Sequence, residues 1–232
     1  MNITFWIMTI LCAISLILAW VMVYGEKKSL HMVTYLAKTV ASICFVAAGF
    51  LAAMLTDGPK PLILLMLGGL VFGMLGDIFL CRVHIAREEF WEILLSAGGV
   101  FFLSGHLCYF ISFISMGGAR HLPVYVLVPL LMILVFMLMK TQEWKIPKKS
   151  WLSYMGYALV SGLMLSAAIE ILLETPAMEE LVLAVAALTF ILSDLALATW
   201  NFGRLHTVWM RYTCITLYYA AQILFVYGIY LN

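Results

Sequence analysis

Stretches of about twenty apolar residues recur along almost the whole chain, and this repetition constrains the fold more than any other feature. A helix needs roughly 20 apolar residues to cross the hydrocarbon core of a bilayer. The chain has 232 residues, of which 65% are hydrophobic and only 11% are charged. Soluble domains contain nearer half apolar and a quarter charged residues. Lipid rather than a protein core must therefore cover much of this surface.

These stretches predict an all-α fold, a polytopic bundle of about eight transmembrane helices. Strands are excluded as spanning elements, because no stretch alternates apolar and polar residues over about ten positions. No segment is polar enough to form a separate domain, so residues 1–232 are expected to form a single helical bundle. The expected spans are residues 3–24, 33–55, 61–81, 93–116, 121–139, 151–173, 178–200 and 209–231.

Lysine and arginine are unevenly distributed between the connections, and this asymmetry predicts the orientation. Connections after even-numbered spans carry only Lys60 and Arg120. Under the positive-inside rule, the other connections face the cytoplasm and both termini lie outside. We expect an integral protein of the bacterial inner (plasma) membrane. The basic residues assigned to the cytoplasmic side are Lys27, Lys28, Arg82, Arg87, Lys140, Lys145, Lys148, Lys149 and Arg204, with Arg211 beside the last.

Charge and cysteine content exclude several other classes of protein. A formal net charge of +1 gives no electrostatic basis for binding nucleic acid. The five cysteines form no CxxC pair and each lies in or beside an apolar stretch, so we expect neither a metal site nor a disulfide. The sequence also lacks G-x-S-x-G, HExxH, P-loop and dinucleotide-binding motifs.

Ionisable and amide side chains inside the spans are the first candidates for function. Such groups cost several kcal/mol in a bilayer unless they face the bundle interior or water. The main ones are Lys38, Asp77, His106, Asp194 and Gln222, and their polar neighbours are Tyr109, Ser193, Tyr218 and Tyr219.

The depth of these groups predicts a shared pocket. At 1.5 Å per residue, Asp77, Asp194 and Lys38 lie roughly 6–9 Å above the cytoplasmic boundary. Three ionisable groups at one level predict a polar pocket that opens toward the cytoplasmic leaflet. His106 and Gln222 lie nearer the midplane and are expected to form its floor.

Each of these residues also has a simpler structural interpretation. Asp77 could bond Arg82 or a loop amide at the end of its helix, and Asp194 could be held in the same way at the end of its own. Lys38 could extend its ammonium group to the membrane surface. His106 could bond a neighbouring carbonyl, and Gln222 could join two helices. Acidic residues near the outer end of the span 151–173, Glu170 and Glu174, are expected to face the outer water.

Two carboxyl groups in one pocket suit reactions that pass through an oxocarbenium ion, as in glycosidases. Like charge and burial favour a state in which one group is protonated and the other ionised. A membrane-embedded version would suit an ether or vinyl-ether lipid. The same residues also allow a proton or ion path in a transporter. Glycines in the spans 61–81 and 93–116 fit either broken transporter helices or close helix contacts. A membrane scaffold is a third interpretation.

Five short segments in order along the chain carry a resemblance to a known family. They are Gly76-Asp77-Ile78-Phe79-Leu80; Gly105-His106-Leu107-Cys108-Tyr109; Tyr154 or Tyr157 followed by Met164 and Ala167-Ala168; Ser193-Asp194 with Leu197-Ala198; and Tyr219-Ala220-Ala221-Gln222. Together they resemble the lysoplasmalogenase (YhhN-like) family of integral membrane proteins. Tyr35-Leu36-Ala37-Lys38 is similar to the family's Lys-Pro segment, with Thr39 in place of the proline.

This resemblance implies an eight-span bundle that hydrolyses the vinyl-ether bond of lysoplasmalogens to a fatty aldehyde and glycerophosphoethanolamine or glycerophosphocholine. It implies no metal and no organic cofactor, and a lysophospholipid within the bilayer as the substrate. Asp77 and Asp194 would be the catalytic pair. The residues expected to bind the substrate or the water are Lys38, His106, Tyr109, Tyr154, Tyr157, Ser193, Tyr219 and Gln222.

Overall fold

The structure, a computed structural model, describes residues 3–82, 85–117, 120–141, 151–202 and 207–232. In this part of the chain the fold is all-helical, as predicted, with a short 3₁₀ turn, η1 (Glu88–Phe90), before the fourth long helix. The long helices are α1 (Ile3–Lys27), α2 (His31–Leu55), α3 (Lys60–Arg82), α4 (Trp91–Gly117), α5 (Leu122–Thr141), α6 (Trp151–Glu174), α7 (Met178–Phe202) and α8 (Val208–Leu231).

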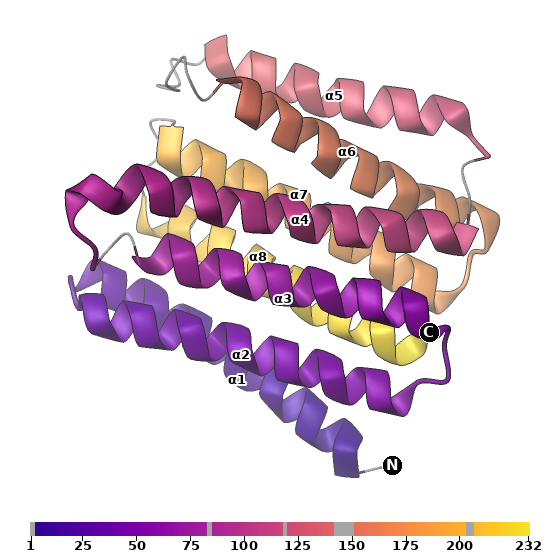
Figure 1. Cartoon of the computed structure of the whole chain (residues 1–232), viewed down its shortest axis with the longest axis horizontal. Coiled ribbons are helices and arrows are strands. Elements are labelled where there is room, and N and C mark those ends of the chain that lie inside the picture. Colours follow the sequence, from indigo (N-terminus) through magenta and orange to yellow (C-terminus); the bar gives the residue numbers. More distant parts are fainter. Residues whose placement is uncertain (1–2, 83–84, 118–119, 142–150, 203–206) are drawn as a thin grey trace.

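Each expected span coincides with one of these helices. Seven of the described helices are long and apolar enough to cross a membrane, and α5 contributes a shorter apolar stretch, Leu122–Leu138. The helices run side by side in alternating directions, and both termini lie at the same end of the bundle (Figure 1). The cytoplasmic assignment of the opposite end stays a prediction, and Lys145, Lys148, Lys149 and Arg204 lie outside the described residues.

The last helix, α8, lies at the centre of the packing. It contacts its neighbour in sequence, α7, and also α1, α2 and α3 from the first half of the chain. Its buried face includes Tyr219, Phe225 and Ile229, none of which is exposed. The first and last thirds of the chain thus share one core, and polar side chains from both come together between them.

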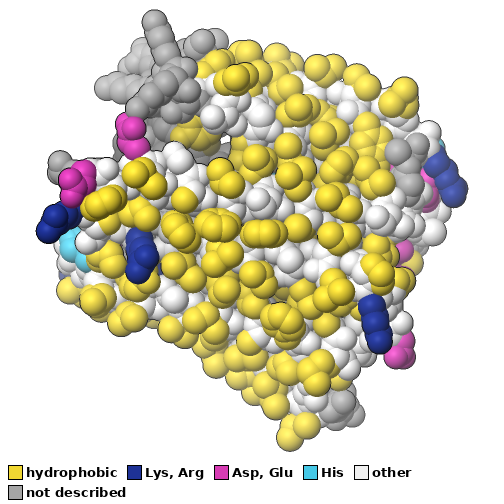
Figure 2. Space-filling view, in the orientation of Figure 1, with side chains coloured by type: hydrophobic (Ala, Val, Ile, Leu, Met, Phe, Trp, Pro, Cys, Tyr) yellow, Lys and Arg dark blue, Asp and Glu magenta, His cyan; other side chains and the backbone are white. Residues whose placement is uncertain are grey.

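The outer surface matches a lipid environment. Large apolar side chains such as Leu64, Leu127 and Leu130 are more than half exposed on the helices. Figure 2 shows hydrophobic side chains over the broad face, with charged side chains mostly at its two ends. This distribution is the reverse of a soluble protein, because apolar surface of this extent would not be stable in water.

Glycines in α3 allow α4 to approach closely. A Cβ atom at Gly69 would lie 2.5 Å from the Tyr109 ring, and one at Gly76 would lie 2.7 Å from the Phe102 ring. Gly105 on α4 faces the backbone carbonyl of Gly69, with 3.2 Å between that oxygen and its ideal Cβ position. Both helices are continuous through these positions. The glycines therefore serve helix contact, one of the two interpretations left open by the sequence.

A methyl group at Gly69 tests this packing. We expect Gly69→Ala to destabilise the protein by about 1–3 kcal/mol, because the new Cβ would overlap the Tyr109 ring. Tyr109 cannot move aside easily, since it stacks on Phe225 with ring centroids 3.9 Å apart. Thermal unfolding in detergent provides the measurement. Gly156→Ala is the matched control, because nothing lies within 4 Å of its ideal Cβ, and it should unfold no earlier than the wild type.

Candidate functional site

A cavity of about 510 Å³ lies at the end of the bundle opposite the two termini. Its position follows from its lining, which comes from the last turns of α1, α3 and α7 and the first turns of α2 and α8. Asp77 and Asp194, from helices far apart in the sequence, both line it. The apolar part of the wall includes Met132, Phe136 and Ile191. A cavity of this size and mixed lining is typical of a site for a small ligand.

Asp77 is held by a network from α2 and α8. Its Oδ1 lies 3.1 Å from the Lys38 ammonium nitrogen, and the two side chains are 1% and 8% exposed. Its Oδ2 accepts a hydrogen bond of 2.6 Å from the Ser42 hydroxyl. The Tyr219 hydroxyl lies 3.1 Å from Ser42 and supports it from behind. Both carboxylate oxygens of Asp77 are therefore acceptors.

Asp194 has a separate set of partners. The Tyr157 hydroxyl donates to its Oδ2 at 3.1 Å, and His106 Nε2 lies 3.3 Å from the same oxygen. The His106–Asp194 contact is an ion pair by distance, although its direction does not satisfy hydrogen-bond geometry. His106 Nδ1 lies 2.8 Å from the Phe102 carbonyl. Because a carbonyl can only accept, Nδ1 carries a hydrogen and Nε2 is the nitrogen that faces Asp194.

Behind the cavity wall, a bond between α4 and α8 supports the site. The Tyr109 hydroxyl donates to Gln222 Oε1 at 3.1 Å. Gly73 of α3 makes room for this bond, because a Cβ atom there would lie 2.8 Å from Gln222 Nε2 and 3.2 Å from the Tyr218 hydroxyl. Gln222 thus joins helices, as its structural interpretation predicted.

The structure separates the sequence-predicted site residues into two groups. Those that line the cavity are Lys38, Asp77, Tyr154, Tyr157, Ser193 and Asp194. Those that lie outside its lining are His106, Tyr109, Tyr219 and Gln222. His106 forms the expected carbonyl bond but also faces Asp194. The Ser193 hydroxyl donates to the Cys214 carbonyl at 3.1 Å, so it also ties α7 to α8.

Two structural alternatives from the sequence do not hold in this geometry. Lys38 does not extend to the membrane surface, because its side chain is 8% exposed and pairs with Asp77. The ion-pair partner of Asp77 is accordingly Lys38 rather than Arg82.

The structure also adds polar residues that sequence reasoning missed. Ser42 bonds Asp77, and its position four residues after Lys38 on one helix face could have revealed it. Glu26 and Arg211 form an ion pair in the cavity wall, near the end of α1 and the start of α8, with His31 also in the lining. The sequence indicated this pair less clearly. Opposite charges near the ends of the first and last spans predict an ion pair only if those two helices are known to be in contact.

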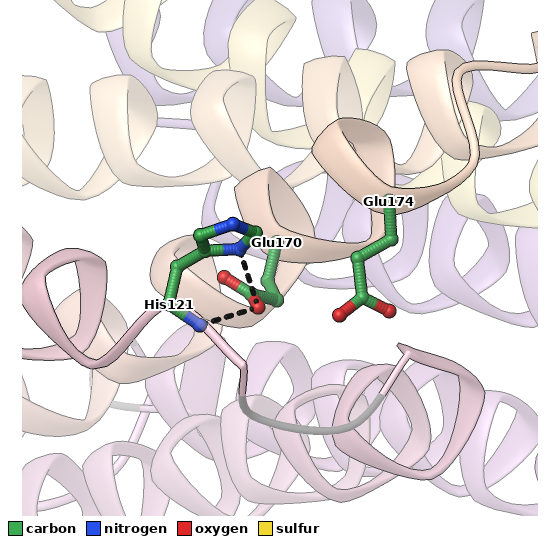
Figure 3. A group of neighbouring side chains, drawn as sticks. All are labelled: His121, Glu170 and Glu174. Carbon is green, nitrogen blue, oxygen red and sulfur yellow. Dashed lines mark hydrogen bonds and ion pairs between the residues drawn. The ribbon is translucent and has the colours of Figure 1, made fainter.

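A second polar cluster lies at the opposite end of the bundle, where the sequence predicted outward-facing acids. This prediction was wrong for Glu170, whose side chain is fully buried, and the Glu174 side chain is only 7% exposed. Glu170 Oε1 accepts from the backbone N–H groups of Arg120 and His121 at 2.9 and 2.8 Å, and lies 2.9 Å from His121 Nδ1 (Figure 3). Burial follows because α6 uses this carboxylate to cap the start of α5.

His121, Glu170 and Glu174 are also the group in the described chain whose ligand atoms are close enough to hold a metal, all within 4.8 Å of one another. Arg120 Nε already lies 3.1 Å from Glu174 Oε1 and balances its charge. The backbone and His121 contacts occupy Glu170 Oε1. We therefore assign this cluster a structural role, joining α5 to α6.

Comparison with known proteins gives one match. The model of the YhhN family matches residues 33–229, which is most of the chain. The matched region holds both aspartates, Lys38 and the residues behind the cavity wall. No curated protein and no solved structure matches the chain.

The Lys38–Asp77 pair can be tested through stability. We expect Lys38→Met to destabilise the protein by about 3–5 kcal/mol, because it leaves a buried carboxylate without its counter-ion. The double variant Lys38→Met/Asp77→Asn should recover most of that loss, since it removes both charges. Thermal unfolding in detergent measures both. Equal destabilisation by the single and double variants would show that the charge pairing is not the cause.

Substitution of Glu170 tests the cluster at the other end. Glu170→Gln should destabilise the protein by about 1.5–3 kcal/mol, because three bonds to an ionised oxygen lose their charge. Glu89→Gln is the control, since that side chain is 63% exposed. If a divalent cation stabilised the wild type but not the variant, the cluster would be a metal site instead.

Proposed function

The chain belongs to the YhhN family, and from that premise we propose that it is a membrane-embedded hydrolase of lysoplasmalogen. The reaction would cleave the vinyl-ether bond and release a fatty aldehyde and glycerophosphoethanolamine or glycerophosphocholine. One observation carries the proposal. Two aspartates from distant helices line the same cavity, and each has a different set of partners.

The shape of the cavity suits an amphipathic substrate. Its lining combines the charged groups near Asp77 and Asp194 with apolar side chains of α5, Met132 and Phe136. A single-chain lipid could place its glycerol near the aspartates and its first chain carbons against these apolar residues. A volume of about 510 Å³ accommodates the reacting part of such a lipid rather than its whole chain.

Hydrogen bonding suggests different roles for the two aspartates. Asp77 accepts from Lys38 and Ser42 with its two oxygens, so a proton on either oxygen would break a bond. Asp77 therefore suits the role of the ionised partner. Asp194 uses Oδ2 for both of its described contacts, its side chain is 20% exposed, and it lines the cavity. Oδ1 can carry a proton without the loss of either contact, which makes Asp194 the better donor.

The proposed reaction starts with proton transfer from Asp194 to the vinyl carbon that is not bonded to the ether oxygen. The double bond supplies the electron pair, and an oxocarbenium ion forms next to the ether oxygen. Carboxylate Asp77 stabilises this cation electrostatically inside a site of low dielectric. Water then adds to the oxocarbenium carbon and returns a proton to the site. The hemiacetal collapses to an aldehyde and the free glycerol hydroxyl, so atoms and charge balance.

Proton- or ion-coupled transport is the second function that these residues allow. Transporters of this kind commonly bind their cargo where helices are interrupted near the midplane. Helices α3 and α7, which carry the aspartates, are continuous through them. Continuous helices favour the hydrolase. Proton-coupled flux in liposomes without lipid turnover would favour the transporter.

Removing either carboxylic acid should stop the reaction while the protein still folds. We expect Asp77→Asn and Asp194→Asn each to lower aldehyde release from lysoplasmalogen by at least about a hundredfold, the usual contribution of an acid–base group. The assay uses purified protein in detergent with lysoplasmalogen and quantifies the aldehyde.

The exposed aspartate Asp57 provides the matched control, and Asp57→Asn should retain wild-type activity. Size-exclusion profiles check that each variant is folded. Full activity in either cavity variant would remove that residue from the mechanism.

A further inference from the structure

An ion pair lines the cavity near the end of α1 and the start of α8, a region that we call its mouth. Arg211 of α8 contacts Glu26 of α1 through two bonds, Nε to Oε2 at 2.7 Å and Nη2 to Oε1 at 2.6 Å. The two side chains are 12% and 17% exposed, and both line the cavity. His31 lines the same region.

The position of this pair matches the layout of a glycerophospholipid. Glu26 is one residue from the end of α1 and Arg211 three residues from the start of α8, whereas Asp77 lies five residues before the end of α3 and Asp194 eight residues before the end of α7. The pair thus lies on the side of the aspartates that faces the membrane surface. In a lysoplasmalogen the headgroup phosphate is separated from the vinyl ether by the glycerol carbons. A lipid bound with its vinyl ether at the aspartates would direct its headgroup toward this mouth.

We propose that Arg211 and Glu26 form the headgroup site, in which Arg211 binds the phosphate and Glu26 binds the primary amine of phosphoethanolamine. This inference rests on the proposed function for the identity of the lipid. The Glu26 carboxylate occupies the Nε–Nη2 edge of the guanidinium, which is the edge that would bind the phosphate. Binding exchanges the Glu26–Arg211 pair for two pairs with the ligand.

The chemistry of both side chains supports this exchange. A guanidinium presents a planar fork that fits carboxylate and phosphate oxygens equally well. Glu26 alone would repel an anionic headgroup, and Arg211 alone would repel a cationic one. A zwitterion inserted between them leaves the net charge of the mouth unchanged, so no unpaired charge is buried. The pair therefore selects zwitterionic headgroups over singly charged ones.

Equilibrium binding of unreactive ligands tests the proposal. The ligands are three saturated ethers with the same chain: 1-O-alkyl-glycerophosphoethanolamine, 1-O-alkylglycerol phosphate and 1-O-alkylglycerol. Arg211→Gln should weaken binding of both phosphate-bearing ligands by roughly tenfold to a hundredfold and leave 1-O-alkylglycerol nearly unchanged. Glu26→Gln should lower the affinity for the phosphoethanolamine ligand relative to the phosphate ligand by roughly tenfold.

The matched control is Arg120→Gln, because Arg120 pairs with a glutamate at the opposite end of the bundle and does not line the cavity. It should leave all three affinities unchanged. If a single variant does not fold, the double variant Glu26→Gln/Arg211→Gln replaces it. The double variant removes both charges and leaves two uncharged side chains that can still hydrogen-bond to each other.

Equal losses for all three ligands in Arg211→Gln would overturn the proposal and leave the pair as a link between α1 and α8. Failure of the wild type to prefer the phosphoethanolamine ligand over 1-O-alkylglycerol would also overturn it. Aldehyde release from lysoplasmalogen is measured separately. If the headgroup effects appear without aldehyde release, the binding site stands and the hydrolase proposal fails.

Discussion

The buried ion pair between Lys38 and Asp77 is the interaction on which the polar end of this bundle depends. Neither charge could remain in a low-dielectric interior without the other. The pair fixes α2 against α3, and Ser42 and Tyr219 connect it to α8. A cavity lined by charged groups is stable here because each of these groups has a partner within the protein. The carboxylate of Asp77 is held in place before any ligand binds, which is the condition for electrostatic catalysis.

Both ends of the bundle contain acidic side chains with little exposure to solvent, but the partners of these side chains differ between the two ends. At the end with the termini, Glu170 is fully buried, and its Oε1 accepts bonds from the residues just before α5 and so joins α6 to α5. At the opposite end, Asp194 is partly exposed to the cavity and keeps capacity for a ligand. Both clusters contain a histidine and acids, and Asp194 lines the described cavity whereas Glu170 does not. Access, rather than residue type, distinguishes the proposed active site from the structural cluster.

Close helix contacts make the cavity possible. Gly69, Gly76 and Gly105 allow α3 and α4 to approach, with Tyr109 and Phe102 packed against the glycine faces. The Phe102 carbonyl also accepts a hydrogen bond from His106 Nδ1, and this bond orients the imidazole toward Asp194. Packing and proton position are therefore coupled through one short segment of α4. This arrangement gives a physical reason for finding glycines and a histidine on the same two helices.

The sequence by itself determined the helical architecture, the spans and several buried polar residues, among them Lys38, Asp77 and His106, because twenty-residue apolar stretches and the cost of burying charge are local properties of a chain. The common depth of Asp77 and Asp194 could also be read from spacing, since helices have a fixed rise per residue. Only the tertiary structure decided the partners. The pairs are Lys38 with Asp77, His106 with Asp194, and Glu26 with Arg211. They depend on the rotation of each helix about its axis and on which helices are its neighbours. The sequence could not show the burial of Glu170 for the same reason, because its donors, Arg120 and His121, lie about fifty residues earlier in the connection before α5.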